Sequence, residues 1–264
     1  MRNVIKEIAA EPFDLTKILD SVQSLSLQNS AKEKLIVILG ATATGKSSLA
    51  LQLAEILNTE IISADSMSVY KNFNIGTAKP TAAQLQRIKH HLIDILNPEE
   101  KFSVAEFVRL ASKIITEINS RGKIPVICGG TGLYIQALVE GYHFTDNAKS
   151  QSKFFKDTGE LKYNALCIGL TANRAELYDR INRRTQKMFD AGLVEEVRRL
   201  LKNGVSENAQ AMLGIGYKET VEYLRGELTL DETISKISQA TRNFAKRQLT
   251  WYRRMNYIKF YSVE

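Results

Sequence analysis

The sequence has few of the residues that build disulfide frameworks and zinc sites. Its 264 residues include two cysteines, Cys128 and Cys167, and three histidines, His90, His91 and His143. The cysteines stand far apart, each at the end of an apolar run, which favours buried free thiols in a reducing compartment. The histidines lack the spacing of zinc ligands. A disulfide scaffold and a zinc site are therefore not expected.

Long apolar runs are also missing. Every apolar run is of strand length, well short of the roughly 20 residues that span a membrane. The N-terminus mixes Arg2 and Lys6 with Glu7 and Glu11, which suits neither a signal peptide nor an acid-poor transit peptide. With 44% hydrophobic and 25% charged residues, the chain is expected to be a cytoplasmic globular protein with no membrane partner.

One segment has no acidic residues. Between residues 242 and 263 the chain carries six lysines and arginines and neither Asp nor Glu, within a protein of net charge +7. Such one-sided charge favours a polyanionic partner, although solubility alone could account for a milder excess. The sequence therefore predicts a basic C-terminal helix that contacts a polyanion.

A glycine-rich loop carries the most specific chemistry. The strand-like run Leu35–Leu39 leads into a segment that fits the pattern G-x-x-x-x-G-K-[ST] and then becomes helical. In such a loop the backbone N–H groups point at a phosphate, the lysine adds a positive charge and the hydroxyl can ligate magnesium. The predicted phosphate-binding residues are Gly40, Ala41, Thr42, Ala43, Thr44, Gly45, Lys46 and Ser47, with Ser47 as the Mg²⁺ ligand. Whose phosphate is bound stays open at this point.

Strands and helices alternate from residue 35 onward. Strands are predicted at 35–39, 60–64, 92–96, 124–128, 165–170 and 257–260, and helices near 46–57, 81–89, 103–120, 132–140, 174–202, 217–224 and 231–254. This order predicts an α/β protein with a P-loop NTPase-like three-layer fold, a central mainly parallel sheet and a basic C-terminal helix. Residues 1–34 form an extension with weakly helical stretches at 4–8 and 15–22. Residues 35–264 form the core, in which the polar segment 143–163 is expected to be a surface loop.

Two further loops are expected at the same edge of the sheet. Asp65 follows the second predicted strand, where it could act as a general base, help to hold magnesium or merely cap a turn. Thr131, in the stretch Gly129-Gly130-Thr131-Gly132, follows the fourth predicted strand, where it could offer a hydroxyl and a helix N-terminus to a ligand or merely close a tight turn. Two loops on one crevice suggest room for two substrates.

Two helices carry the remaining candidates. Arg180 and Arg184 share one helix face, where an arginine could neutralise a departing phosphate or simply be solvated. In the last helix Phe244 and Trp251 fall on a face predicted to be core, and the opposite face carries bases such as Arg242 and Lys246.

Five blocks in order resemble the tRNA dimethylallyltransferase family, also called the tRNA isopentenyltransferases. They are "GATATGKSSLALQLAEILNTEIISADSMSVYKNFNIGTAKPT", "HHLIDILNPEEKFSVAEF", "GKIPVICGGTGLYIQALVEG", "RAELYDRINRRTQKMFDAGLVEEVRRLL", and "AMLGIGYKE" with the later "ATRNFAKRQLTWYRR". The resemblance implies that the phosphate loop holds dimethylallyl diphosphate with Mg²⁺. It also implies that the acceptor is the exocyclic amine of the adenosine 3′-adjacent to the anticodon, in the anticodon stem-loop of tRNA.

The resemblance also assigns roles to residues. It implies that Asp65 is the general base, that Thr131 lies near the diphosphate and the acceptor, and that Arg184 acts on the leaving group. Lys46 and Ser47 hold the diphosphate and magnesium. The predicted tRNA contacts are Ser66, Met67, Ser68, Arg180, Arg242, Lys246, Arg247 and Gln248. The protein is expected to be a monomer.

One departure from the family keeps other functions open. Members usually insert a helical subdomain with a motif like HPND..R..RALEV where this chain has only the polar segment 143–163. Prenylation of free AMP, ADP or ATP is therefore the first alternative. An ATP-dependent small-molecule kinase and a non-catalytic RNA-binding protein are the others. The intact Asp65, Thr131 and Arg184 argue against the last of these.

Overall fold

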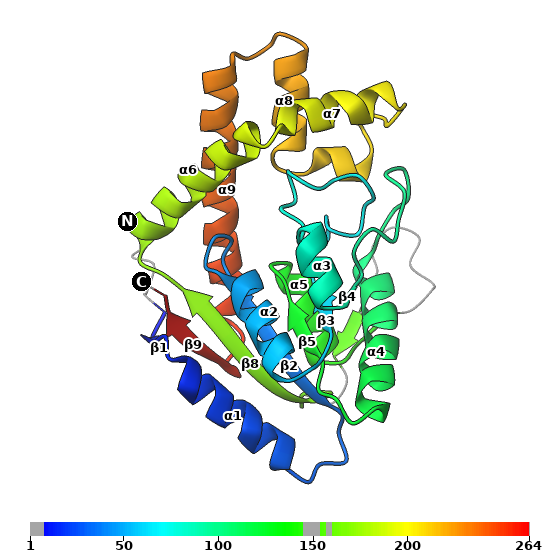
Figure 1. The fold of residues 1–264 in the computed structure, drawn as a ribbon, viewed down its shortest axis with the longest axis vertical. Coiled ribbons are helices and arrows are strands. Elements are labelled where there is room, and N and C mark those ends of the chain that lie inside the picture. Colours follow the sequence, from blue (N-terminus) through cyan, green and yellow to red (C-terminus); the bar gives the residue numbers. More distant parts are fainter. Residues whose placement is uncertain (1–7, 145–153, 157–159, 264) are drawn as a thin grey trace.

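Seven parallel strands form the central sheet of the molecule (Figure 1). The computed structural model describes residues 8–144, 154–156 and 160–263. The sheet order is β1-β9-β8-β2-β5-β3-β4, and each neighbouring pair is parallel. In that order the strands are β1 (Glu11–Pro12), β9 (Ile258–Ser262), β8 (Asn164–Thr171), β2 (Lys34–Gly40), β5 (Val126–Cys128), β3 (Ile61–Ser63) and β4 (His90–His91). The predicted α/β fold is confirmed.

Helices cover both faces of the sheet, as the alternation along β2 requires. Ile36 and Ile38 face one apolar cluster, which also contains buried residues of α1 (Leu15–Leu27) and α2 (Lys46–Ile56). Leu35 and Val37 face the other cluster, with α4 (Val104–Ser120), α5 (Gly132–Val139) and α9 (Leu230–Tyr252). Because side chains alternate along a strand, a strand buried on both faces is apolar throughout.

Part of the predicted N-terminal extension packs on the sheet. β1 adds to the sheet edge beside β9, and α1 buries Ile18, Val22 and Leu25. Asp14 begins α1 by accepting a hydrogen bond from the Thr16 N–H (2.9 Å). The predicted helix from residue 15 is confirmed and extends to Leu27, whereas the one at 4–8 lies almost wholly outside the described residues.

The single helix predicted over residues 174–202 is wrong. The structure has α6 (Arg174–Asp190) and α7 (Leu193–Lys202), separated at Gly192, whose φ of +95° lies in the left-handed region. Glycine adopts this conformation without the steric cost that a Cβ atom brings, so the chain changes direction there. α7, η1 (Gln210–Leu213) and α8 (Tyr217–Leu224) lie beside the far end of α9 in the upper part of Figure 1.

Two other predicted segments differ from the structure. The strand predicted at 92–96 is absent because Leu92 and Asp94 have φ angles of +60° and +55°, so the two-residue strand β4 ends at His91. The helix before it is the six-residue α3 (Ala82–Arg87). In the segment 143–163, predicted to be a loop, β6 (Tyr142–Phe144) pairs with β7 (Phe154–Lys156); residues 145–153 and 157–159 lie outside the described part.

The C-terminal helix α9 connects the upper helices with the sheet (Figure 1). Ile237 and Tyr252 are buried in the core, and Trp251 packs against it half-buried. Phe244, also predicted to be core, instead lines the cavity described below. No helix of the described residues is long and apolar enough to cross a membrane.

Candidate active site

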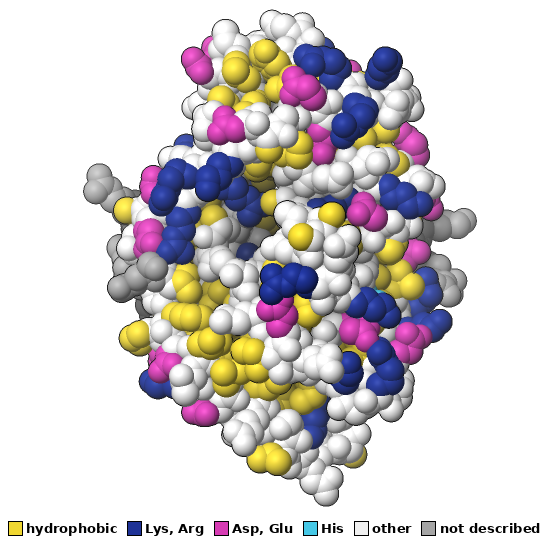
Figure 2. All heavy atoms as spheres, viewed as in Figure 1, with side chains coloured by type: hydrophobic (Ala, Val, Ile, Leu, Met, Phe, Trp, Pro, Cys, Tyr) yellow, Lys and Arg dark blue, Asp and Glu magenta, His cyan; other side chains and the backbone are white. Residues whose placement is uncertain are grey.

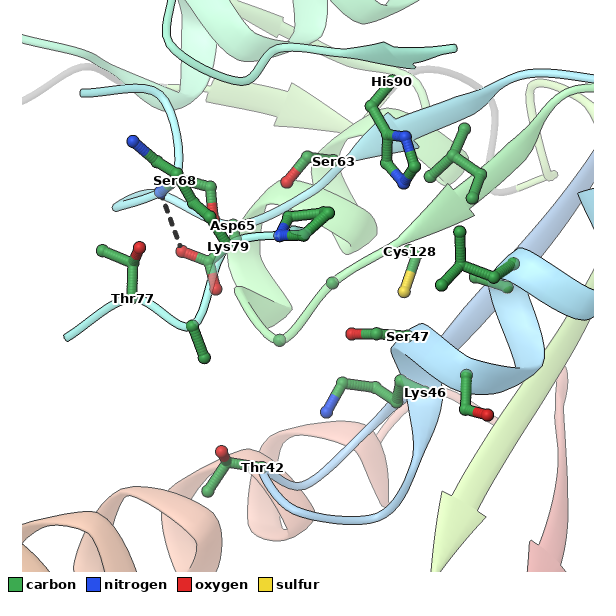
Figure 3. A pocket seen from close by; sticks show the side chains of 18 of the residues that line it. Thr42, Lys46, Ser47, Ser63, Asp65, Ser68, Thr77, Lys79, His90 and Cys128 are labelled. Atoms are coloured by element: carbon green, nitrogen blue, oxygen red, sulfur yellow. Dashed lines mark hydrogen bonds between the residues drawn. The ribbon is translucent and has the colours of Figure 1, made fainter. Parts of the chain in front are cut away.

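A cavity of about 500 Å³ opens where β2, β5 and β3 end (Figure 3). Its walls come from the phosphate loop (residues 40–47), the turn after β3, the second glycine loop (residues 129–132), α6 and α9. Carboxyl ends of parallel strands are the usual place for ligands in an open α/β sheet. Of the residues predicted from sequence, Thr42, Ala43, Gly45, Lys46, Ser47, Asp65, Ser68, Arg184 and Gln248 line it.

The phosphate loop presents unpaired N–H groups to this cavity. The backbone N–H groups of residues 45–48, at the start of α2, donate no hydrogen bond within the described chain. Thr44 turns its hydroxyl inward to the Ala41 carbonyl (2.8 Å), and Gly40 and Ala41 lie behind the lining. Free N–H groups at a helix N-terminus carry a partial positive charge, so this end of the cavity suits an anion.

Two half-buried cations increase that preference. Lys46 donates to the Ala41 carbonyl (2.6 Å), and burial together with the nearby charge of Arg184 lowers its pKa to about 8. Burial also lowers the pKa of Arg184, whereas the negative charge of Asp65 raises it. Neither cation forms an ion pair among the residues described. A charge that is partly withdrawn from water and has no partner is costly, so both side chains call for an anionic ligand.

Asp65 fills the turn-capping role considered for it and keeps one carboxylate oxygen available for another. Its Oδ1 caps the turn after β3 by accepting from the N–H groups of Met67 (2.8 Å) and Ser68 (3.3 Å). Its Oδ2 accepts no hydrogen bond within the described residues, and the carboxylate shares the cavity with Lys46 and Ser47 (Figure 3). One oxygen therefore fixes the side chain and the other is available to a ligand.

The second glycine loop lies against the turn that carries Asp65. The Thr131 hydroxyl accepts from the Ser66 N–H (3.1 Å), and the Thr131 N–H donates to the Ala64 carbonyl (3.2 Å). A Cβ atom on Gly129 would lie 2.2 Å from the Ala64 carbonyl oxygen, so only glycine allows this approach. Thr131 and Ser66 thus adjoin the cavity without lining it, and Met67 packs against the core.

The remaining predicted tRNA contacts lie in three different places. Three bases, Arg242, Lys246 and Arg247, lie on the outer side of α9. Arg242 donates a hydrogen bond from Nη1 to Oδ1 of Asn182 (2.6 Å), and its Cζ lies 5.8 Å from the centre of the Tyr178 ring. Lys and Arg side chains gather over α6 and α9 beside a hollow in the surface (Figure 2). Arg180, by contrast, pairs with Glu176 and the Val263 carbonyl. Ser68 and Gln248 are buried in the cavity wall.

Several lining residues escaped the sequence reasoning. Cys128, at the end of β5, is half-buried and lines the cavity; burial raises the pKa of its thiol to about 11. Ser63, Thr77, Lys79, His90 and Phe244 also line it. Apart from the family blocks, no pattern in the sequence marked these positions, because they come from a short strand end, an irregular loop and a helix face that looked apolar.

The loop that contributes Thr77 and Lys79 is held by a buried carboxylate. Glu196 of α7 is 2% exposed and accepts from the N–H groups of Asn74 (3.1 Å) and Ile75 (3.0 Å) and from the Tyr217 hydroxyl (2.7 Å). Such fully bonded carboxylates fix irregular backbone in place. The helices beyond α6 therefore position one wall of the cavity.

Comparison with protein families gives a match over most of the chain. The family model described as IPP transferase matches residues 68–157 and 143–255. A relative from Carboxydothermus hydrogenoformans, the tRNA dimethylallyltransferase, is 43% identical over 286 aligned positions, covering 87% of this chain and 92% of the relative. Since 87% of 264 residues is about 230, about 56 of those 286 positions have no residue in this chain. The tRNA dimethylallyltransferase of Streptococcus mutans is 42% identical over 88% of this chain and 93% of its own length.

Solved structures agree with the sequence matches. The tRNA isopentenylpyrophosphate transferase from Bacillus halodurans superposes with a TM-score of 0.78 at 36% identity, over 88% of this chain and 90% of that one. The corresponding transferase from Staphylococcus epidermidis gives the same TM-score at 35% identity, over 88% and 93% of the two chains.

Proposed function

The chain belongs to the IPP transferase family and is by homology a tRNA dimethylallyltransferase, and from this premise we propose which atoms of the cavity carry out the transfer. The donor is dimethylallyl diphosphate and the acceptor is the exocyclic amine of the adenosine 3′-adjacent to the anticodon. Lys46, Arg184 and the phosphate loop hold the diphosphate, and Asp65 takes the proton of the amine. We propose that the protein acts as a monomer in the cytoplasm.

The observation that carries this proposal is a pair of half-buried cations, without ion-pair partners among the described residues, that share the cavity with Asp65. Lys46 and Arg184 share the cavity with the free N–H groups of residues 45–48. A diphosphate provides the charge that these groups lack, and it gains further negative charge as it leaves the prenyl carbon. Donors fixed before the reaction stabilise that developing charge at no cost of reorganisation.

Asp65 supplies the other requirement of the reaction. An amine attached to an aromatic ring is a weak nucleophile, so its proton has to be removed as the new bond forms. In the proposed step the amine nitrogen bonds to C1 of the dimethylallyl group while the bond from C1 to the diphosphate oxygen breaks. The electron pair of that bond leaves with pyrophosphate, and the proton passes to Oδ2 of Asp65.

The site also suits magnesium in the way this family implies. Ser47 places a hydroxyl in the cavity beside the loop that would hold the diphosphate. Mg²⁺ needs few protein ligands when phosphate oxygens and water complete its shell. Among the described residues no cluster of three His, Cys, Asp or Glu side chains could hold a metal by itself, so Ser47 and the diphosphate would share it. The bound ion would neutralise part of the diphosphate charge.

The same geometry argues against a kinase. P-loop kinases and ATPases hold Mg²⁺ with a carboxylate from a second strand as well as with the loop hydroxyl. Here the two neighbours of β2 are β8, which ends in Thr171, and β5, which ends in Cys128, whose thiol is kept protonated by a pKa of about 11. Neither strand ends in a carboxylate. Asp65 stands one strand further away, after β3, with Oδ1 engaged in the turn.

We propose that segment 143–163 replaces the helical insertion usual in the family. The two family matches overlap at residues 143–157, and about 56 aligned positions of the C. hydrogenoformans relative have no residue in this chain, since 87% of 264 residues is about 230 of 286. A shortened insertion keeps free AMP, ADP or ATP as the alternative acceptor. The bases on the outer side of α9 favour tRNA, because they lie outside the cavity lining and a free nucleotide in the cavity needs no such surface.

The half-buried Arg242 and the exposed Lys246 on the outer side of α9 should carry much of the affinity for tRNA. Arg242→Ala combined with Lys246→Ala is expected to weaken tRNA binding and to reduce the slope of log Kd against log salt by about 2, one for each lost phosphate contact. Filter binding over a salt series measures this. Arg109→Ala with Lys113→Ala removes the same charge from the exposed face of α4 and should leave the slope unchanged. An unchanged slope in the α9 variant would contradict the proposed surface.

The affinity for dimethylallyl diphosphate should depend on the charge of Lys46. Because burial lowers the pKa of Lys46 to about 8, the free protein holds this side chain charged below pH 8 and neutral above it. Binding should therefore weaken as the pH rises through about 8. Calorimetry above and below that pH tests this, with Lys46→Arg as the control, since its guanidinium stays charged and should flatten the profile. A wild-type affinity independent of pH would show that Lys46 does not bind the diphosphate as a cation.

Transfer to a defined RNA tests the proposed acceptor. An unmodified anticodon stem-loop should gain a labelled dimethylallyl group when adenosine follows the anticodon. The same RNA with inosine at that position lacks the exocyclic amine and should gain none. Equal labelling of both RNAs would refute the proposed acceptor atom.

A further inference from the structure

Gln248 of α9 holds the two glycine loops of the cavity together. Its Oε1 accepts a hydrogen bond from the Thr42 N–H in the phosphate loop (2.8 Å). Its Nε2 donates to the Gly130 carbonyl in the second glycine loop (2.8 Å). The side chain is 5% exposed. One amide thus joins two loops that follow different strands and lie far apart in the sequence.

The fit around this amide is tight. A Cβ atom at position 130 would lie 2.4 Å from Nε2 of Gln248, so a side chain there would push the amide away from the loop. Both polar atoms of the buried amide form hydrogen bonds. Rotating the amide away would leave the Thr42 N–H and the Gly130 carbonyl without these partners. The side chain is therefore fixed in one orientation.

Both ends of this link lead directly to the reacting groups. Thr42 lies in the loop that carries Lys46. The Nζ of Lys46 donates a hydrogen bond to the carbonyl of Ala41, the residue before Thr42. Gly130 precedes Thr131, which bonds the Ser66 N–H and the Ala64 carbonyl on either side of Asp65. The distance between the diphosphate cradle and the general base is thus set partly by Gln248.

We infer that Gln248 is a positioning residue that fixes the spacing between the prenyl donor and Asp65, and not the tRNA contact that the family resemblance implied. The inference rests on the proposed function. It gives α9 two roles on two faces: the exposed bases meet RNA, and the buried amide aligns the loops. Since a misplacement of reacting atoms by about 1 Å can cost a factor of 100 in rate, such a link affects catalysis more than binding.

Replacing Gln248 by methionine tests the inference. Met has a similar length and tolerates burial, but it makes neither hydrogen bond. Gln248→Met is expected to lower kcat/KM for dimethylallyl diphosphate by about 10- to 100-fold, mostly through kcat, and to leave the Kd for tRNA unchanged. Gln23→Met makes the same change on the exposed face of α1 and should alter neither.

A second variant covers the case in which Gln248→Met does not fold. Gln248→Glu keeps the size and the acceptor for Thr42 but turns an oxygen toward the Gly130 carbonyl, so it should also lose kcat with tRNA affinity retained. Unchanged kinetics in the folded variants, or a weakened Kd for tRNA with kcat intact, would overturn the inference.

The proposed function can fail independently of this link. If the wild-type protein transferred nothing to tRNA, the proposed function would be wrong. Hydrogen exchange at the Thr42 N–H would then still decide the role of Gln248, because Gln248→Met removes the oxygen that accepts from this N–H and should speed its exchange. Equal exchange in wild type and Gln248→Met would refute the link without reference to transfer.

Discussion

Asp65→Asn is expected to lower kcat for prenyl transfer by about 10²- to 10⁴-fold, the usual contribution of a general base. The asparagine Oδ1 can still accept from the N–H groups of Met67 and Ser68, so the turn after β3 should keep its shape. The amide nitrogen that replaces Oδ2 cannot take a proton. Single-turnover transfer to tRNA measures the loss, and the Kd for tRNA should not change.

Asp14 offers a matched control for this substitution. Its Oδ1 caps α1 through the N–H groups of Thr16 (2.9 Å) and Lys17 (3.3 Å), two and three residues on, as Asp65 caps its own turn. Asp14→Asn should therefore retain full activity. If Asp65→Asn did so as well, another group would have to accept the proton.

Arg184→Met is expected to reduce kcat/KM by about 10²- to 10³-fold, the usual effect of removing one preorganised donor from a developing charge. Two further readouts separate this from a loss of structure. Because Arg184 lowers the pKa of Lys46, removing it should move the alkaline limit of diphosphate binding above pH 8. Because a cation that is partly withdrawn from water and lacks an ion-pair partner is costly, thermal stability should hold or increase.

The adjacent arginine provides the control. Arg183 lies on the same helix but is exposed and paired with Asp179 (2.5 Å), so Arg183→Met should leave transfer and its pH profile unchanged. An Arg184→Met protein with normal kcat/KM and an unmoved alkaline limit would show that the leaving diphosphate does not depend on this guanidinium.

Parts of the cavity could be predicted where a short motif or the geometry of parallel strands determines the position of a residue. The phosphate loop follows from the spacing of Gly40, Gly45 and Lys46, and the convergence of Asp65 with the second glycine loop follows from the geometry of parallel strands. Leu35–Leu39 marked β2 because a strand buried on both faces is apolar throughout. These features depend on a few neighbouring residues.

What could not be predicted depends on contacts between distant residues. Gln248 looked like part of a polar RNA-binding face until its amide was found between Thr42 and Gly130. Phe244 looked like core from its helical spacing, but the cavity opens on that face. Leu92 takes a left-handed φ that its residue type disfavours, so tertiary packing overrode the local preference for a strand.

The most direct test is transfer of a labelled dimethylallyl group, with Mg²⁺, to unmodified tRNA run beside AMP, ADP and ATP as acceptors. The cavity, its cations and the basic face of α9 predict label in tRNA, lost in Asp65→Asn. Label in the free nucleotides alone would contradict the assignment of tRNA as the acceptor, and label in none would contradict prenyl transfer by this cavity.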